Sequence, residues 1–431
     1  MRFRQTSEEN DNIIVTFARN TYSTDMPYQT YTLSNGLRII HRPTSSAVSY
    51  CGFTVNAGTR DESTGKFGLA HFVEHMIFKG TTHRRSWHIL NRMETVGGEL
   101  NAYTTKEETV IYSVFLEEHL SRAMDLLADL VINSQFPAHE LEKEREVILD
   151  EINSYRDTPS ELIYDEFENR LFSGHALGHN ILGSQKDLES LCSEDGHIFL
   201  TQQYHPGNMI FFSMGKTDFK KIIRLAEHFF SALPLSSHKN NRIPPGHNPP
   251  FHIQEKMETF QAHTILGTRA YHMFDPKRHS LYLLNNILGG PGMNSLLNVS
   301  LREKTGYVYN VESSVTSYTD TGIFSIYFGS DPKNTEKCLQ LIHKELNRLR
   351  TTALTQNQLN AAKKQLLGQL GVATENKENT ALNMGKNFLH YGSCSTTEEV
   401  ARRIESITSK EILETANELF SEKKLSTLIF H

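Results

Sequence analysis

The sequence predicts an α+β fold made of two related domains, each a mostly antiparallel sheet packed with helices. Three observations lead to this prediction. Strand and helix patterns occur in both halves of the 431-residue chain, a proline-rich stretch separates the halves, and the second half partly repeats the first. Hydrophobic residues make up 38% of the chain, so each half can bury a core of its own.

The expected first domain, residues 29–232, opens with a hairpin. Asn35-Gly36 lies between two apolar runs, and this pair favours a tight turn because both residues readily adopt positive φ. The pattern predicts helices from 67 to 96, and strands at 48–55, over a long stretch from 100 to 115, and at 209–214. Residues 1–28 are polar and lack periodicity, which predicts a poorly ordered N-terminal arm.

Residues 233–250 form the expected linker, because five prolines and a run of polar residues are concentrated there. The expected second domain, residues 251–431, contains strand patterns near 259–267 and 323–328, a helix at about 277–288 and amphipathic helices up to residue 420. Aligning residues 75–80 with 285–290 places His71 on Leu281, Glu74 on Leu284 and His75 on Asn285. The second domain would therefore keep the helix and lose its ionisable residues.

Composition and charge exclude several kinds of function. With 44 basic and 50 acidic residues the net charge is −6, so nucleic acid is not an expected partner. The apolar runs are too short to cross a bilayer and residues 1–20 show no export signal, so we expect no membrane partner. The cysteines are widely spaced, which favours a reducing, cytoplasmic location over a disulfide framework or a cysteine-based metal site. They are Cys51, Cys192, Cys338 and Cys394.

The strongest local pattern is His71-Phe72-Val73-Glu74-His75. On a helix, His71 and His75 lie one turn apart on the same face and can hold one metal ion. Glu74 shares that face and can take a proton from a water molecule at the metal, and this order of residues occurs in catalytic zinc sites. Such a motif can also arise by chance on a surface helix. Its flanking residues are apolar, however, and ionisable groups in a buried helix need partners.

A zinc site needs a third protein ligand, and the segment 141–152 offers candidates. Glu144 and Glu151 are two helical turns apart and share a face with Ile148 and Tyr155. Carboxylates on an apolar stripe require pairing, whereas Glu142, Glu146 and Asp150 have the pattern of solvated charges. The alternative is a charged amphipathic helix with no role at a metal.

From about residue 31 to the C-terminus, the chain resembles the pitrilysin/insulinase family of inverted-motif zinc peptidases. The resemblance is greatest to the branch of bacterial processing proteases and the mitochondrial processing peptidase. Two segments carry it, residues 68–81 around the histidines and residues 97–104, Gly-Gly-Glu-Leu-Asn-Ala-Tyr-Thr. The resemblance implies that Glu151 is the third zinc ligand and that Glu144 supports the site without binding the metal.

The second half contains Arg302 and Tyr309, which resemble an arginine–tyrosine pair of the family. The resemblance implies that both donate hydrogen bonds to the oxyanion of an attacked amide. Without it, a surface arginine and a core tyrosine would explain these residues equally well. The glycine-rich segment 289–295 also resembles a family loop, with Pro291 as a departure, and Glu108 stands where the family has histidine.

We therefore expect a zinc-dependent endopeptidase with one Zn²⁺ per chain. An extended peptide substrate would add as a strand beside residues 100–105 and contact Asn101 and Ala102, although Asn101 could be a simple turn residue. The family builds a clam-shell chamber from four related domains, so a two-domain chain implies a homodimer, or a heterodimer, in which Arg302 and Tyr309 complete the other subunit's site. The alternative is a non-catalytic structural or partner subunit of a hetero-oligomeric peptidase.

Overall fold

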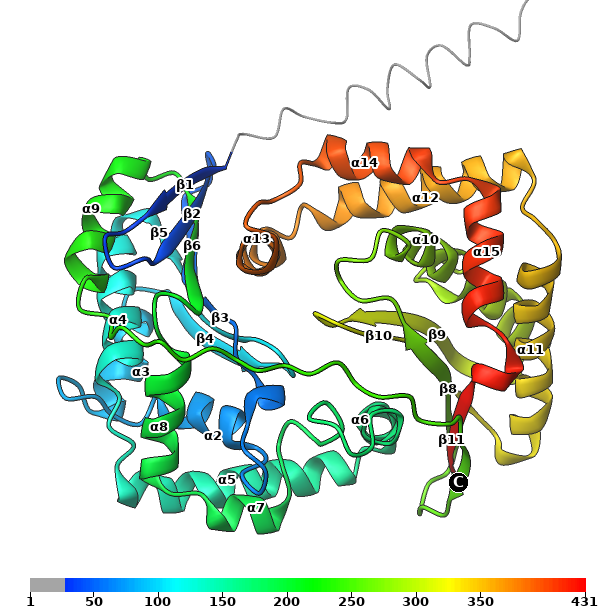
Figure 1. Ribbon diagram of the computed structural model, residues 1–431, viewed down its shortest axis with the longest axis horizontal. Coiled ribbons are helices and arrows are strands. Elements are labelled where there is room, and N and C mark those ends of the chain that lie inside the picture. The colour runs from blue at the N-terminus through cyan, green and yellow to red at the C-terminus, as the bar shows by residue number, and fades with distance from the viewer. Residues whose placement is uncertain (1–27) are drawn as a thin grey trace, which may run out of the picture.

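Two sheets, each covered by helices, form the two halves of the molecule (Figure 1). The computed structural model describes residues 28–431, and residues 1–27 of the expected arm lie outside this part. The arrangement confirms the predicted α+β fold.

The first sheet has six strands in the order β1-β2-β6-β3-β5-β4. All neighbours are antiparallel except β2 and β6. The predicted hairpin joins β1 to β2, with Gly36 at a φ of 91°. The strands are β1 (Gln29–Thr32), β2 (Arg38–Pro43), β3 (Val48–Val55), β4 (Glu99–Thr104), β5 (Thr109–Leu116) and β6 (Met209–Gly215).

Helices of the first half cover one face of this sheet. Helix α4 packs on β3 and β5, and α2 and α3 pack on β4. The helices are α2 (Leu69–Met76), α3 (Ser86–Glu94), α4 (Leu120–Asn133), α5 (Ala138–Arg156), α6 (Pro159–Leu171), α7 (Gln185–Ser190), α8 (Ser193–Gln203) and α9 (Phe219–Phe230).

The second sheet repeats the topology of the first without β1. Its order is β7-β11-β8-β10-β9, and again one pair, β7 and β11, is parallel. The strands are β7 (His252–Glu255), β8 (Ala262–Ala270), β9 (Val308–Ser317), β10 (Gly322–Ser330) and β11 (Ser426–Phe430). The helices are α10 (Arg278–Gly289), α11 (Thr335–Thr351), α12 (Gln356–Ala373), α13 (Lys377–Tyr391), α14 (Thr397–Ser406) and α15 (Ser409–Leu419), with a short wide turn η3 (Asn298–Glu303) before β9.

The two halves exchange a helix. Helix α6 of the first half packs on β8 and β11, and α13 of the second half packs on β3 and β6. Phe167 of α6 is buried with Ile265 and Leu428, and Phe388 of α13 with Phe212. Figure 1 shows both helices at the junction of the halves. Residues 233–251 run between the halves without a helix or strand, and the division of the chain at 233–250 stays a prediction.

A buried ionic cluster also joins the halves. Arg60 donates to Glu107 at 2.6 Å and to Asp320, in the β9–β10 turn, at 2.5 and 2.8 Å. Nearby, Glu108 accepts from His390 of α13 at 2.6 Å and pairs with Lys386 at 3.0 Å. The glutamate that replaces an expected histidine therefore fastens α13 to the first sheet.

The predicted single strand from 100 to 115 is wrong. The structure has two strands, β4 and β5, joined by a turn at residues 105–108. Thr105 makes this turn because its Oγ1 accepts from the backbone N–H groups of Glu107 and Glu108. The three charged residues that follow it, Lys106, Glu107 and Glu108, are buried, and no glycine or proline marks the turn in the sequence.

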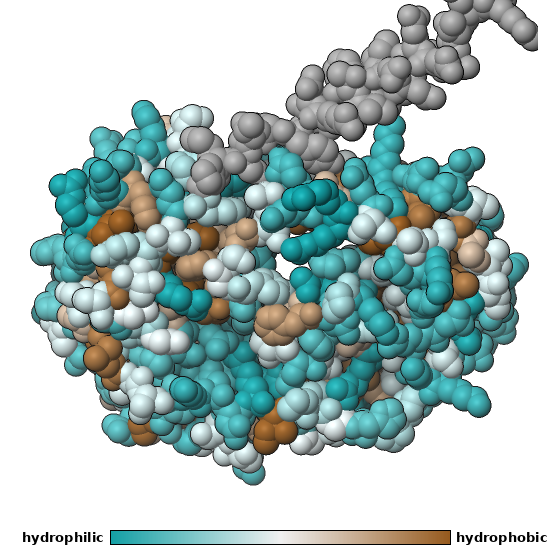
Figure 2. Space-filling model, turned by 45° about the horizontal axis from the view of Figure 1, so that its top comes forward, coloured by the Kyte–Doolittle hydropathy of each residue, from teal (hydrophilic) through white to brown (hydrophobic). Residues whose placement is uncertain are grey.

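No helix within residues 28–431 is long and apolar enough to cross a bilayer. Figure 2 shows that the face it presents is mainly hydrophilic, with hydrophobic side chains in small separate groups. Single exposed hydrophobic residues of this kind are normal for a protein surface.

Candidate metal centre

Helix α2 begins at a glycine and buries its apolar face. Gly68, at the N-cap, has a φ of 88°, which favours glycine. Phe72, Val73 and Met76 are fully buried in the first core. The opposite face turns His71 and His75 towards α5, with which α2 packs.

Helix α5 supplies two carboxylates to the same region. Its buried residues include Ile148 and Glu144, at 1% and 6% exposure. Glu151, two turns beyond Glu144, is exposed, as are Glu142 and Glu146. The side of α5 that faces α2 therefore carries both carboxylates, as the spacing predicts, but only Glu144 is buried.

One ligand atom each of His71, His75 and Glu151 lie within 4.8 Å of one another. The Nε2 atoms of His71 and His75 are 3.7 and 3.6 Å from Oε2 of Glu151. Burial, together with the charge of His75, lowers the pKa of His71 to about 3, so this imidazole is neutral as a ligand must be. Among residues 28–431 no other three His, Cys, Asp or Glu side chains form such a group. Two histidines and one carboxylate fit a catalytic zinc ion, which keeps one position open.

Glu144 orients His75. Its Oε2 lies 3.1 Å from Nδ1 of His75, and its Oε1 accepts from Nζ of Lys79 at 2.5 Å. Because Nδ1 is engaged, Nε2 of His75 is the nitrogen that faces Glu151. A carboxylate behind a ligand histidine fixes the ring and makes it a stronger ligand.

Glu74 lies on the same helix, and its Oε2 is buried without a hydrogen-bond partner. Burial raises the pKa of the Glu74 carboxyl, and Thr104 at the end of β4 partly opposes this increase. A buried carboxylate oxygen with no partner in a folded protein calls for a functional explanation. A water molecule or substrate at the cluster would provide one.

Comparison with known proteins agrees with this geometry. The family described as "Insulinase (Peptidase family M16)" matches residues 38–185, and "Peptidase M16 inactive domain" matches residues 194–366. An uncharacterized zinc protease of Bacillus subtilis, YmxG, is 31% identical over 404 residues, which is 93% of this chain and 97% of that protein. The chain belongs to the insulinase (M16 peptidase) family. An uncharacterized zinc protease of Rickettsia bellii is 34% identical and covers 92% of this chain and 96% of its own length.

Solved M16 structures share the fold. A peptidase M16 inactive domain from Pseudomonas fluorescens superposes with a TM-score of 0.88 at 20% identity, covering 94% of this chain and 97% of that one. A protease from Helicobacter pylori also gives 0.88, at 21% identity and with 94% and 99% coverage. The predicted family and fold are therefore confirmed.

The structure of this M16 family member does not bring Arg302 and Tyr309 to the cluster within one chain. Both lie in the second half, in η3 and at the start of β9, and both are exposed. Tyr309 is 81% exposed, so its interpretation as a core tyrosine is wrong. Neither side chain makes a hydrogen bond or ion pair with residues 28–431.

Asn101 and Ala102 are half-buried in β4, at the edge of the first sheet. They pair with Tyr112 and Ile111 of β5 on one side. No strand pairs with the other side of β4 within the described chain. The interpretation of Asn101 as a turn residue is therefore wrong, and β4 offers its outer edge beside α2.

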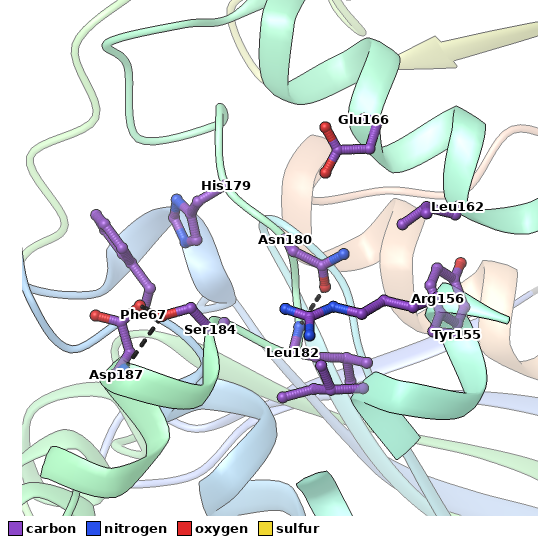
Figure 3. Close-up of a pocket in the computed structure, with 12 residues that line it drawn as sticks. Phe67, Tyr155, Arg156, Leu162, Glu166, His179, Asn180, Leu182, Ser184 and Asp187 are labelled. Atoms are coloured by element: carbon purple, nitrogen blue, oxygen red, sulfur yellow. Dashed lines mark hydrogen bonds between the residues drawn. The ribbon is translucent and has the colours of Figure 1, made fainter. Parts of the chain in front are cut away.

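A pocket of 280 Å³ borders the site, lined in part by the end of α5 just beyond Glu151. Figure 3 shows Phe67 and His179 at one side, Tyr155, Arg156 and Leu162 at the other, and Asn180 between them.

The sequence pattern did not identify Lys79 or Thr104 as residues of the site. Lys79 could have been found, because it lies one turn after His75 in the same motif. Thr104 needed the β4–β5 turn, which the sequence pattern did not reveal.

Proposed function

We propose that the protein is a zinc endopeptidase that cleaves peptides bound in an extended conformation. The observation that carries this proposal is the convergence of His71, His75 and Glu151, with Glu74 beside them and an open strand edge adjacent. The names of the relatives as zinc proteases support it.

His71, His75 and Glu151 would hold one Zn²⁺ per chain. Zinc bound there supplies a Lewis acid that polarises a peptide carbonyl and lowers the pKa of water. Glu74 accepts the proton of the attacking water and returns it to the leaving amine. Its carboxylate is suited to this because one oxygen is buried with no other partner.

The substrate would pair with the outer edge of β4. Main-chain hydrogen bonds along this edge, near Asn101 and Ala102, hold a peptide extended without reading its sequence. The pocket at the end of α5 would take one of its side chains. Short peptides and unfolded segments, whose backbone is free, are therefore the expected substrates.

Arg302 and Tyr309 would act on the site of a second copy. Both are exposed, and they lie in the half that has no ligand cluster. Hydrogen bonds from a guanidinium and a phenol stabilise the oxygen that gains negative charge when the amide is attacked. This assignment implies a homodimer with two composite sites. A heterodimer with a related chain is the alternative assembly.

Cleavage of a quenched fluorescent peptide by the purified protein tests the proposal. We expect turnover that is lost on chelation and restored by stoichiometric zinc. Turnover that survives complete removal of zinc would contradict it. Stoichiometric zinc without cleavage would favour the second candidate, a non-catalytic or partner subunit, and the "inactive domain" match of residues 194–366 is the observation on its side.

The four cysteines support a cytoplasmic location as part of the proposal. All four are free thiols in the structure, and a reducing compartment maintains that state.

A further inference from the structure

Helix α2 starts without a cap from its own N-terminal residue. Gly68 has no side chain, and a Cβ there would meet the carbonyl oxygen of Leu182 at 2.5 Å. Gly183 makes the reciprocal approach, since its Cβ would meet the carbonyl oxygen of Phe67 at 2.2 Å. Two glycines thus let the turn segment 182–183 pass directly over the start of the helix. This close approach leaves no room for a capping side chain at Gly68.

A carboxylate from the segment just before the helix takes the place of the missing cap. Glu62 accepts from the backbone N–H of Gly68 at 2.9 Å and of Ala70 at 2.7 Å, one oxygen for each donor. Its side chain is fully buried. A carboxylate here satisfies two otherwise unpaired N–H groups and complements the positive end of the helix dipole. The second of these residues, Ala70, directly precedes His71.

His179 contacts Glu62 and is itself held by Phe67 and Lys106. Nε2 of His179 lies 3.1 Å from Oε2 of Glu62, and the imidazole stacks on Phe67 with ring centroids 4.1 Å apart. Lys106, which is buried, donates to the backbone carbonyl of His179. The anchor of α2 is thus built from segments outside α2 itself.

We propose that Glu62 is a positioning residue of the metal centre. It holds the first turn of α2 so that His71 and His75 face Glu151, and it touches neither the metal nor the substrate. The inference rests on the proposed zinc site. An ordinary helix cap would contribute only stability, whereas a positioning residue also changes the affinity and geometry of the bound metal.

Glu62→Gln tests this proposal. The glutamine amide presents N–H donors to a backbone N–H, so only one of the two hydrogen bonds from α2 can remain. We expect zinc to bind about tenfold more weakly or worse, by competition with a chelator well below the unfolding temperature. The visible absorption of the Co²⁺-substituted protein should shift, because it reports coordination geometry, and kcat should fall more than KM changes.

Glu411→Gln is the matched control. Glu411 caps α15 in the second half by accepting from the backbone N–H of Thr408 at 2.7 Å. Glu411 is exposed, and its replacement removes the charge of a helix-capping carboxylate in the half without the cluster. We expect unchanged zinc affinity and an unchanged Co²⁺ spectrum.

A folded Glu62→Gln protein with wild-type zinc affinity and Co²⁺ spectrum would overturn the proposal, even if its unfolding temperature falls. If this variant does not fold, zinc affinity and the Co²⁺ spectrum are measured in His179→Asn instead. This variant removes the imidazole that contacts Glu62 and leaves the Glu62 carboxylate in place. Wild-type values in that variant would also overturn the proposal. A wild-type chain that binds no zinc would instead overturn the proposed function, and this inference with it.

Discussion

Helices α2 and α10 occupy equivalent places in the two halves, yet only one faces a ligand cluster. Each follows the strand, β3 or β8, that lies third from the β4 or β9 edge of its sheet. Where α2 has His71 and Glu74, the predicted repeat gives α10 Leu281 and Leu284, and both leucines are fully buried.

The surroundings differ in the same way. Helix α5 faces α2 with Glu144 and Glu151, whereas α12, which packs on α10, adds the buried Leu359 to the second core. The same arrangement of strands and helices therefore occurs in both halves with different side chains beside the helix. A few side chains decide whether the space beside the helix is filled by hydrocarbon or kept polar for a metal.

Glu74→Gln should have the largest effect. Because the amide cannot accept a proton from water, we expect kcat to fall about 10³-fold, with zinc still bound. Steady-state cleavage of a fluorescent peptide together with metal analysis measures both. The matched variant in the second half, Leu284→Met, conserves volume and should leave kcat unchanged. Retained turnover in Glu74→Gln would show that Glu74 is not the base that accepts the proton from water.

Removing a buried aromatic ring from α6 or from α13 should destabilise the protein by a similar amount. Phe167→Ala and Phe388→Ala each remove a buried ring, 1% and 5% exposed, from the junction. We expect the free energy of unfolding to fall by about 3–5 kcal/mol in each, measured by urea denaturation. Val372→Ala, at an exposed site on α12, should change it by less than about 0.5 kcal/mol. A small effect of either phenylalanine would mean that the two helices are not equivalent.

Glu144→Gln should weaken zinc binding by about 10–100-fold, because His75 then loses its carboxylate partner. Glu146→Gln changes an exposed carboxylate on the same helix and should leave zinc affinity unchanged. Competition with a chelating dye measures both variants. Equal affinities in the two would show that Glu144 does not support His75.

Mixing two inactive variants tests whether the halves of different chains cooperate. In random dimers of Glu74→Gln and Arg302→Ala chains, half the dimers are mixed, and each has one intact composite site. We expect about one quarter of wild-type activity after subunit exchange. No recovery in dimers that native mass spectrometry shows to be mixed would contradict the composite site.

The smallest effect concerns acid stability. Burial alone would raise the pKa of Glu108, but His390 and Lys386 outweigh burial and hold that pKa below its ordinary value. The stabilisation is therefore present above the pKa of the unfolded chain and is lost as the pH falls through the lower pKa of the folded chain. Below about pH 4.5, wild type should lose stability more steeply than Glu108→Gln in denaturation at several pH values. Equal slopes would show that this contact does not stabilise the junction.

Local patterns predicted the hairpin at Asn35-Gly36, the helix of His71 and His75, and the shared face of Glu144 and Glu151 on α5, because each depends on residues close in sequence. They did not predict that Glu151 is exposed. The repeat register predicted that the helix of the second half has Leu281 and Leu284 in place of ionisable residues, and the structure buries both leucines. The same patterns could not predict the exchange of α6 and α13, since an amphipathic helix does not specify which sheet it covers.

The remaining omissions are contacts that depend on how separate segments pack together. The hydrogen bonds of Glu62 to α2 depend on how segment 182–183 crosses the helix, and the pairing of Glu108 with His390 joins opposite halves of the chain. Strands β7, β9 and β11 were not predicted. β7 and β11 have only four and five residues, and the edge strand β9 contains many polar residues, so none of them has a clear apolar pattern.

Zinc content by native mass spectrometry of wild type, His75→Ala and Asn285→Ala tests the central difference between the halves. The two variants change corresponding positions of α2 and α10. We predict one zinc per chain in wild type and in Asn285→Ala, and none in His75→Ala. Zinc retained in His75→Ala, or lost in Asn285→Ala, would contradict the assignment of the metal site to the first half.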